Sequence, residues 1–155
     1  MPLSDLLAAE AIMPSLKASS KKQALQEIAE RTALLTGLSA REVFDILLQR
    51  ERLGSTGVGG GIAIPHGKLP HFDRLFALFA RLEKPVDFDA ADGQPVDLLF
   101  MLLTPESAGA DHLKALARIA RLMRDPAVIQ KLRTTRDAAG LFSILSMPAT
   151  TSNAA

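Results

Sequence analysis

The sequence contains no cysteine, which excludes disulfide bonds, thiolate metal sites and a cysteine nucleophile, and which fits a reducing compartment. It also lacks a long apolar run. The longest, from Leu98 to Leu103, is far shorter than the roughly 20 residues that span a bilayer. The first residues have neither the basic nor the apolar region of a secretion signal. We therefore expect a cytoplasmic protein without membrane insertion.

Neither sign of charge is in excess. The net charge is +1 and the pI is near 8.1, so the overall balance points to neither nucleic acid nor an anionic membrane as a partner. A length of 155 residues, with 48% hydrophobic and 23% charged residues, is typical of one globular domain with its own core. We expect this domain to cover residues 1–147 and a small, polar, disordered tail to cover residues 148–155.

The N-terminal half predicts an extended segment followed by two helices. The segment at 12–18 contains a proline, so at most it forms an edge strand. Ser20 and Ser39 each precede a glutamine or glutamate by three residues, which is the capping-box signature of a helix start. Gly37 and Gly54 mark the expected ends of these two helices.

The remaining chain predicts three strands and then three helices. The strands are expected at 62–64, 75–82 and 96–103, and the last is apolar on both faces, as in a central strand. The helices are expected at 111–124, 126–132 and 136–145. In the first of these, the residues expected to face the core are Leu113, Leu116, Ala117, Ala120 and Met123. The order of strand, two helices, three strands and three helices predicts a three-layer α/β/α fold with a mixed central sheet.

A glycine-rich loop is the most informative part of the chain. Residues 54–68 read GSTGVGGGIAIPHGK, so the loop runs into a short apolar segment that ends at His66. Pro65 fixes φ before this histidine, and Gly67 after it has no Cβ to obstruct an approaching partner. This arrangement would present an imidazole for chemistry with a large partner.

The loop fits neither phosphate-binding fingerprint. The dinucleotide pattern G-x-G-x-x-G fails because Ile62 occupies the position of its last glycine. A Walker A loop ending at Gly67-Lys68 would also require glycine at position 62, and it would require serine or threonine in place of Leu69. Both fingerprints also run from a strand into a helix, whereas this loop runs from a helix into a strand. We expect no nucleotide cofactor here.

The other candidates for chemistry are His71 and His112. His71 has no identifiable partner and is expected to be exposed, whereas His112 lies in the first turn of a helix, where an anion is favoured. The three histidines lack the spacing of a zinc site, and Ser55 is not in a G-x-S-x-G elbow, so we expect neither a metal nor a serine nucleophile.

What remains is His66 as a nucleophile toward phosphorus. Imidazole is largely neutral near pH 7, and phosphoryl transfer needs mainly positioning and hydrogen bonds to the phosphoryl oxygens. Arg50, on the helix before the loop, could supply these donors or could be only a solvated helix charge. A binding module whose imidazole merely recognises an anion is a further alternative.

These residues also carry a family resemblance. Arg50-Glu51 followed by residues 54–57 and 61–68 closely resembles the IIA proteins of the bacterial phosphotransferase system, most of all their nitrogen-regulatory branch. The resemblance extends from about residue 3 to residue 145. It implies that His66 accepts a phosphoryl group on Nε2 from an HPr-like phosphocarrier protein, with Arg50 and His112 beside it. The chain departs from the family at Gly60, where many members have asparagine, so an amide side-chain contact would be missing.

The resemblance further implies a role for the phosphorylated form. A nitrogen-regulatory IIA protein signals through its phosphorylation state to target proteins, such as components of potassium transport or sensor kinases. The alternative is a sugar-specific IIA component that passes the phosphate to a IIB domain. Because only a short tail follows residue 145, a free-standing regulator is the favoured expectation. In either case the chain would be a phosphotransferase component with a phosphohistidine intermediate, rather than a free-standing turnover enzyme.

Overall fold

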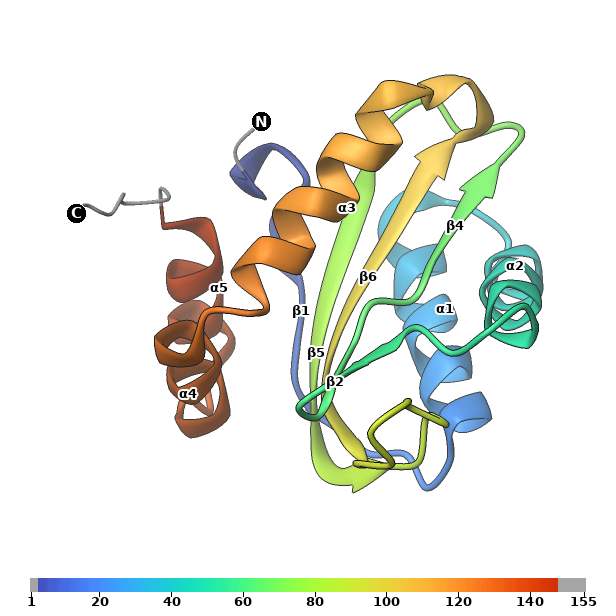
Figure 1. Cartoon of the computed structure of the whole chain (residues 1–155). Coiled ribbons are helices and arrows are strands. Elements are labelled where there is room, and N and C mark those ends of the chain that lie inside the picture. Colours follow the sequence, from blue (N-terminus) through green and yellow to red (C-terminus); the bar gives the residue numbers. More distant parts are fainter. Residues whose placement is uncertain (1–2, 148–155) are drawn as a thin grey trace.

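A six-stranded mixed sheet forms the centre of the fold, with helices on both of its faces (Figure 1). The structure, a computed structural model, describes residues 3–147, so the predicted tail at 148–155 lies outside the described residues. The elements are η1 (Leu3–Asp5), β1 (Leu7–Leu16), α1 (Lys21–Thr36), α2 (Ala40–Arg52), β2 (Gly57–Gly59), β3 (Ile62–Ala63), β4 (His66–Leu69), β5 (Phe76–Val86), β6 (Val96–Pro105), η2 (Glu106–Ala108), α3 (Ala110–Leu122), α4 (Pro126–Thr134) and α5 (Ala138–Ser146). Helix α1 lies behind the sheet with α2 beside it, and α3 crosses the opposite face. The predicted three-layer α/β/α fold is confirmed.

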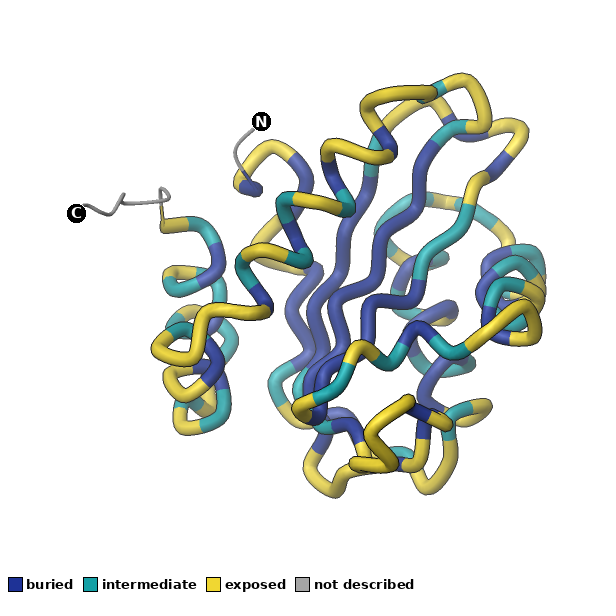
Figure 2. Tube along the Cα trace, viewed as in Figure 1, coloured by how far each residue is buried: buried dark blue, intermediate teal, exposed yellow. Residues whose placement is uncertain are grey.

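The strand order is β1-β5-β6-β3-β2, and β4 also pairs with β6. Strands β5 and β6 are antiparallel, whereas β1 runs parallel to β5, and β3 and β4 run parallel to β6. Strand β1 lies at the edge, as Pro14 within it predicts. Residues 98–103 of β6 are all buried, which confirms the central strand, and Figure 2 shows the buried residues concentrated in the sheet.

The glycine-rich region contains more strands than the sequence predicts. Instead of one strand at 62–64, the structure has β2, β3 and β4. Gly59, Gly60 and Gly61 all have positive φ, which allows the tight turn between β2 and β3. Pro65 has no N–H to donate to a ladder and lies between β3 and β4. His66 therefore begins a strand of its own rather than following one.

The helix ends follow the predicted signals in most cases. The hydroxyl groups of Ser20 and Ser39 each accept the backbone N–H three residues further on. Gly37 ends α1 in the left-handed conformation, with φ of 79°. The prediction for α2 is wrong by one residue, because Leu53 rather than Gly54 is its C-cap.

The buried face of α3 differs from the prediction. Leu113 is 67% exposed and Ala117 is also exposed, whereas His112, Ala115 and Ile119 are buried. Residues four apart share one side of a helix, so Leu113 and Ala117 point together away from the sheet. Because α3 has apolar residues on more than one side, the prediction that Leu113 and Ala117 face the core is wrong.

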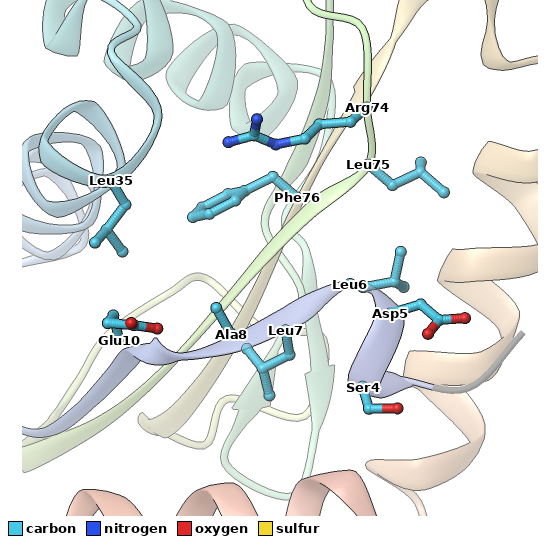
Figure 3. A pocket seen from close by; sticks show the side chains of 10 residues that line it. All are labelled: Ser4, Asp5, Leu6, Leu7, Ala8, Glu10, Leu35, Arg74, Leu75 and Phe76. Carbon is cyan, nitrogen blue, oxygen red and sulfur yellow. The ribbon is translucent and has the colours of Figure 1, made fainter.

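A hollow of about 400 Å³ lies where η1 and the start of β1 meet the start of β5 and the end of α1 (Figure 3). Leu35 and Phe76 contribute apolar side chains, while Asp5, Glu10 and Arg74 contribute charges of both signs.

Candidate active site: a cleft with two histidines

His66 and His112 lie side by side in an open cleft of about 630 Å³. Their ring centroids are 5.9 Å apart and the rings are tilted by 55°. Arg50 also lines the cleft, so the structure brings all three predicted site residues together. The other lining residues come from α2, β4 and the residue after α2, and they are Ile46, Gln49, Arg52, Leu53, Gly67 and Lys68. His71 is exposed, as predicted, and does not line the cleft.

The hydrogen bonds of His66 define which ring nitrogen carries a proton. Nδ1 lies 2.8 Å from the carbonyl oxygen of Ile64, and Nε2 accepts from Nε of Arg50 at 3.3 Å. A carbonyl oxygen only accepts and a guanidinium only donates. Both contacts are satisfied by the neutral ring with its proton on Nδ1. This tautomer leaves the lone pair on Nε2, the atom that the family resemblance implicates.

The environment of His66 also favours the neutral ring. Burial lowers its pKa below the ordinary value, the carbonyl of Ile64 opposes that effect, the charge of Arg50 lowers the pKa further, and Glu51 raises it. The net direction is downward. The imidazole is therefore predominantly neutral, and able to attack phosphorus, at neutral pH.

Arg50 is held between the end of α2 and the His66 ring. Its Nη1 donates to the carbonyl oxygen of Gly54 at 2.8 Å, in addition to the contact of Nε with His66. Among the described residues, no acceptor is bound by Nη2. A guanidinium has five N–H donors in a planar fork, so Arg50 retains donors for the oxygens of an anion placed on Nε2.

His112 is 7% exposed and lies on the inner side of α3. Its Nδ1 is 2.6 Å from the hydroxyl oxygen of Thr104, which is buried at the end of β6. Because Thr104 engages Nδ1, Nε2 is the ring nitrogen available to a ligand. Burial lowers the pKa of His112, and positive charge on His66 and Lys68 lowers it further. Sequence reasoning missed Thr104, although a polar residue at the end of an apolar central strand was a usable signal.

Glu51 is a second residue that sequence reasoning missed. Its side chain is buried, at 6% exposure for the residue, and it accepts hydrogen bonds from the backbone N–H of Thr56 at 3.1 Å and from the Thr56 hydroxyl. Lys21 of α1 forms an ion pair with it at 3.2 Å. Glu51 thus ties the end of α2 to the glycine-rich loop, which fixes Arg50 relative to that loop. The only signal in the sequence was its place in the Arg50-Glu51 pair.

Two glycines of the loop have structural roles that differ from the expectation. A Cβ on Gly67 would clash with Cγ2 of Ile46, so this glycine allows α2 to pack against β4 rather than leaving room for a partner. Gly60 does not line the histidine cleft. Its N–H donates to Asp92 at 2.9 Å, its carbonyl accepts from Arg133, and a Cβ there would meet open space. The departure from asparagine at this position therefore lies away from the two rings.

Within residues 3–147, no group of three or more histidine, aspartate or glutamate side chains is placed to hold a metal ion. No helix in that range combines the length and the apolar character needed to cross a membrane.

Comparison with known proteins identifies the family. Residues 5–147 match the model of the family described as phosphoenolpyruvate-dependent sugar phosphotransferase system, EIIA 2. The chain belongs to this EIIA 2 family. A nitrogen regulatory protein of Bradyrhizobium diazoefficiens is 62% identical to it over 151 residues, which are 97% of this chain and 99% of that protein. One from Escherichia coli is 41% identical over 147 residues, covering 94% of this chain and 90% of the relative.

Solved structures agree with this assignment to the EIIA 2 family. The nitrogen regulatory protein IIA-Ntr of Neisseria meningitidis superposes with a TM-score of 0.87 at 36% identity, covering 92% of this chain and 98% of that one. The mannitol IIA protein of Escherichia coli has the same fold, with a TM-score of 0.73 at 24% identity over 89% of this chain and 97% of that one. The predicted resemblance to IIA proteins of the nitrogen-regulatory branch is confirmed.

Proposed function

We propose that this EIIA 2 protein is a regulatory phosphocarrier in which His66 accepts a phosphoryl group on Nε2. The observation that carries the proposal is the fixed tautomer of His66: Nδ1–H is held by the Ile64 carbonyl, and the lone pair of Nε2 lies beside the Arg50 guanidinium. A nucleophile with this geometry needs no general base, because no proton must leave the attacking nitrogen.

The transfer step follows from these contacts. The Nε2 lone pair forms a bond to phosphorus while the bond between phosphorus and the donor's ring nitrogen breaks, and that electron pair returns to the donor ring. The attack leaves positive charge on the His66 ring, which the Ile64 carbonyl stabilises by accepting from Nδ1–H. Arg50 donates to the equatorial oxygens, where a loose transition state carries its negative charge. His112, 5.9 Å away between ring centroids, is placed to contact the same oxygens through Nε2.

The donor in this proposal is an HPr-like phosphocarrier protein, and the phosphorylated form acts in the cytoplasm on target proteins, such as components of potassium transport or sensor kinases. The names of the relatives support the regulatory branch, since those with 62% and 41% identity are nitrogen regulatory proteins. Phosphorylation adds about −1.5 to −2 charges to the cleft, enough to alter the docking of a partner. Transfer to a IIB domain for sugar uptake is the second candidate, because the family description names a sugar phosphotransferase system.

The test is phosphorylation by a reconstituted donor system with phosphoenolpyruvate. We expect one acid-labile, base-stable phosphoryl group per chain, complete loss of labelling in His66→Ala, and normal labelling in the matched variant His71→Ala. Labelling of His66→Ala at the normal rate would contradict the proposal. Reversible binding of inorganic phosphate without a covalent label would favour the anion-binding module, and rapid transfer to a IIB domain would favour the sugar-specific role.

A further inference from the structure

A second groove, of about 590 Å³, lies between the β2–β3 turn and the region where α3 ends and α4 begins. It shares no lining residue with the histidine cleft. Its lining is largely apolar and includes Ile62, Ile64, Met123 and Ile129, with Val58 at its edge and 58% exposed. Those four side chains are themselves buried, and Val58 supplies exposed apolar surface in a groove that the described part of the chain leaves open.

Positive charge lies along the outer side of α3, the helix whose C-terminal end borders this groove. Lys114, Arg118 and Arg121 are spaced at i, i+4 and i+7, which places them on one side of the helix, and Arg124 lines the groove itself. From Lys114 to Arg124 this basic stripe spans about 15 Å. Among residues 3–147, none of the four side chains forms an ion pair or a hydrogen bond with another side chain.

Three carboxylates near the groove already have other partners, whereas Asp111, in the first turn of α3, has no ion pair among the described residues. Asp97 is bound by Arg133 at 2.9 Å, Asp92 accepts from the N–H of Gly60, and Asp125 caps α4 by accepting from the N–H of Ala127. Over 110–147 the chain contains seven lysine and arginine residues and three aspartates. Asp111 lies one turn before Lys114, so the part of the stripe without a neighbouring unpaired carboxylate on α3 is Arg118, Arg121 and Arg124.

We propose that the groove and the basic stripe together dock an acidic, amphipathic segment of a target protein. Apolar side chains of that segment would enter the groove, and its carboxylates would pair with Arg118, Arg121 and Arg124. The apolar lining favours a protein over nucleic acid, because it contains no aromatic side chain on which a base could stack. The net charge of only +1 for the whole chain favours the same choice.

This docking surface is coupled to the histidine cleft, and that part of the inference rests on the proposed function. Helix α3 carries His112 on its inner side and the stripe on its outer side, while Ile64 lines the groove and also binds Nδ1 of His66. A phosphoryl group on His66 adds negative charge, which opposes an acidic partner through the Coulomb interaction. We expect phosphorylation to weaken docking roughly two- to fivefold, with a smaller effect at high salt.

The experiment uses the full chain and a fluorescent synthetic peptide with leucines on one helical side and glutamates flanking them. A matched peptide has glutamine in place of glutamate. We expect saturable anisotropy with the acidic peptide only, weakening at high salt, and amide shift changes at Met123 and Ile129. The double variant R121E/R124E should lose at least tenfold in affinity, whereas the exposed-charge control Lys22→Glu on α1 should not.

Equal binding by R121E/R124E, absent binding, or shift changes confined to the histidine cleft would overturn the proposal. Preference for duplex DNA over the acidic peptide, or self-association that covers the groove, would overturn it as well. Because the peptide titration uses unphosphorylated protein, its outcome is independent of whether His66 accepts phosphate. A failure of labelling at His66 would leave the docking result standing.

Discussion

The histidine cleft and the hollow at the start of β1 and β5 are both open and both carry charge, yet they differ in what they can do. The hollow mixes Asp5 and Glu10 with Arg74, so its charges can neutralise one another (Figure 3). The histidine cleft is lined by Arg50, Arg52 and Lys68, and none of its described lining residues is a carboxylate. It also contains His66, whose tautomer is set by its hydrogen bonds. Volume alone therefore does not identify a site for chemistry, whereas a nucleophile of defined tautomer beside an arginine with unused donors does.

The sharpest way to test that contrast is to remove one arginine from each region. Arg50→Ala should lower the initial rate of His66 phosphorylation about 10²- to 10³-fold, the size of effect seen when a donor to a developing negative charge is lost. Arg50→Lys keeps the charge but not the fork, so its rate should be intermediate. The matched variant Arg74→Ala should be phosphorylated at the normal rate. A comparable slowing in Arg74→Ala would show that the cleft has no special electrostatic role.

Two substitutions of glutamate by glutamine test the buried residue that holds Arg50 and the glycine-rich loop together, rather than the residues that line the cleft. Glu51→Gln leaves Lys21 without its buried partner and weakens the bonds to Thr56, so we expect it to lower the free energy of unfolding by about 1–3 kcal/mol. Phosphorylation should also slow, because Arg50 and the glycine-rich loop lose their common attachment. Urea denaturation measures the first effect. The exposed Glu10→Gln, in the other hollow, should change neither quantity.

The pH dependence should distinguish the cleft from an exposed histidine. Burial lowers the pKa of both His66 and His112, so the unfolded chain binds more protons than the folded chain as pH falls. Stability from these rings is complete above their unfolded pKa, near 6.5, and is lost as pH falls toward their lowered folded values. The phosphorylation rate should fall over the same acidic range, because protonation removes the Nε2 lone pair. Urea midpoints between about pH 5 and pH 8 should rise with pH, and this rise should be smaller in His66→Gln and unchanged in His71→Gln.

The smallest effect is expected at Gly60. Its φ of +67° is one that asparagine tolerates, and a Cβ there would meet open space, so Gly60→Asn should change stability by less than about 1 kcal/mol. Because Gly60 does not line the histidine cleft, the phosphorylation rate should also stay close to normal. A large gain in rate in a stopped-flow phosphorylation assay would mean that an amide at this position reaches the phosphoryl group.

The features that sequence reasoning found are mostly those encoded by neighbouring residues. Helix caps at Ser20 and Ser39 and the left-handed Gly37 depend on contacts within a few positions, so local patterns predicted them. The meeting of Arg50, His66 and His112 came from the family resemblance, since the pattern alone left Arg50 open as a solvated charge.

What sequence reasoning missed depends on distant pairings. Glu51 forms its ion pair with Lys21, thirty positions away in the sequence. Thr104 is hydrogen-bonded to His112 because α3 places this histidine beside the end of β6. The glycine-rich segment divides into three strands because β3 and β4 pair with the distant β6, while β2 pairs with β3, and no local pattern specifies the pairing with β6.

Nitrogen NMR of the labelled imidazole, before and after incubation with the donor system, probes the proton and the phosphorus on the same ring. We predict that His66 begins with a protonated Nδ1 and an unprotonated Nε2, and that phosphorus coupling then appears on Nε2 alone. A proton found on Nε2 in the starting protein, or phosphorus found on Nδ1 or on another histidine, would contradict it.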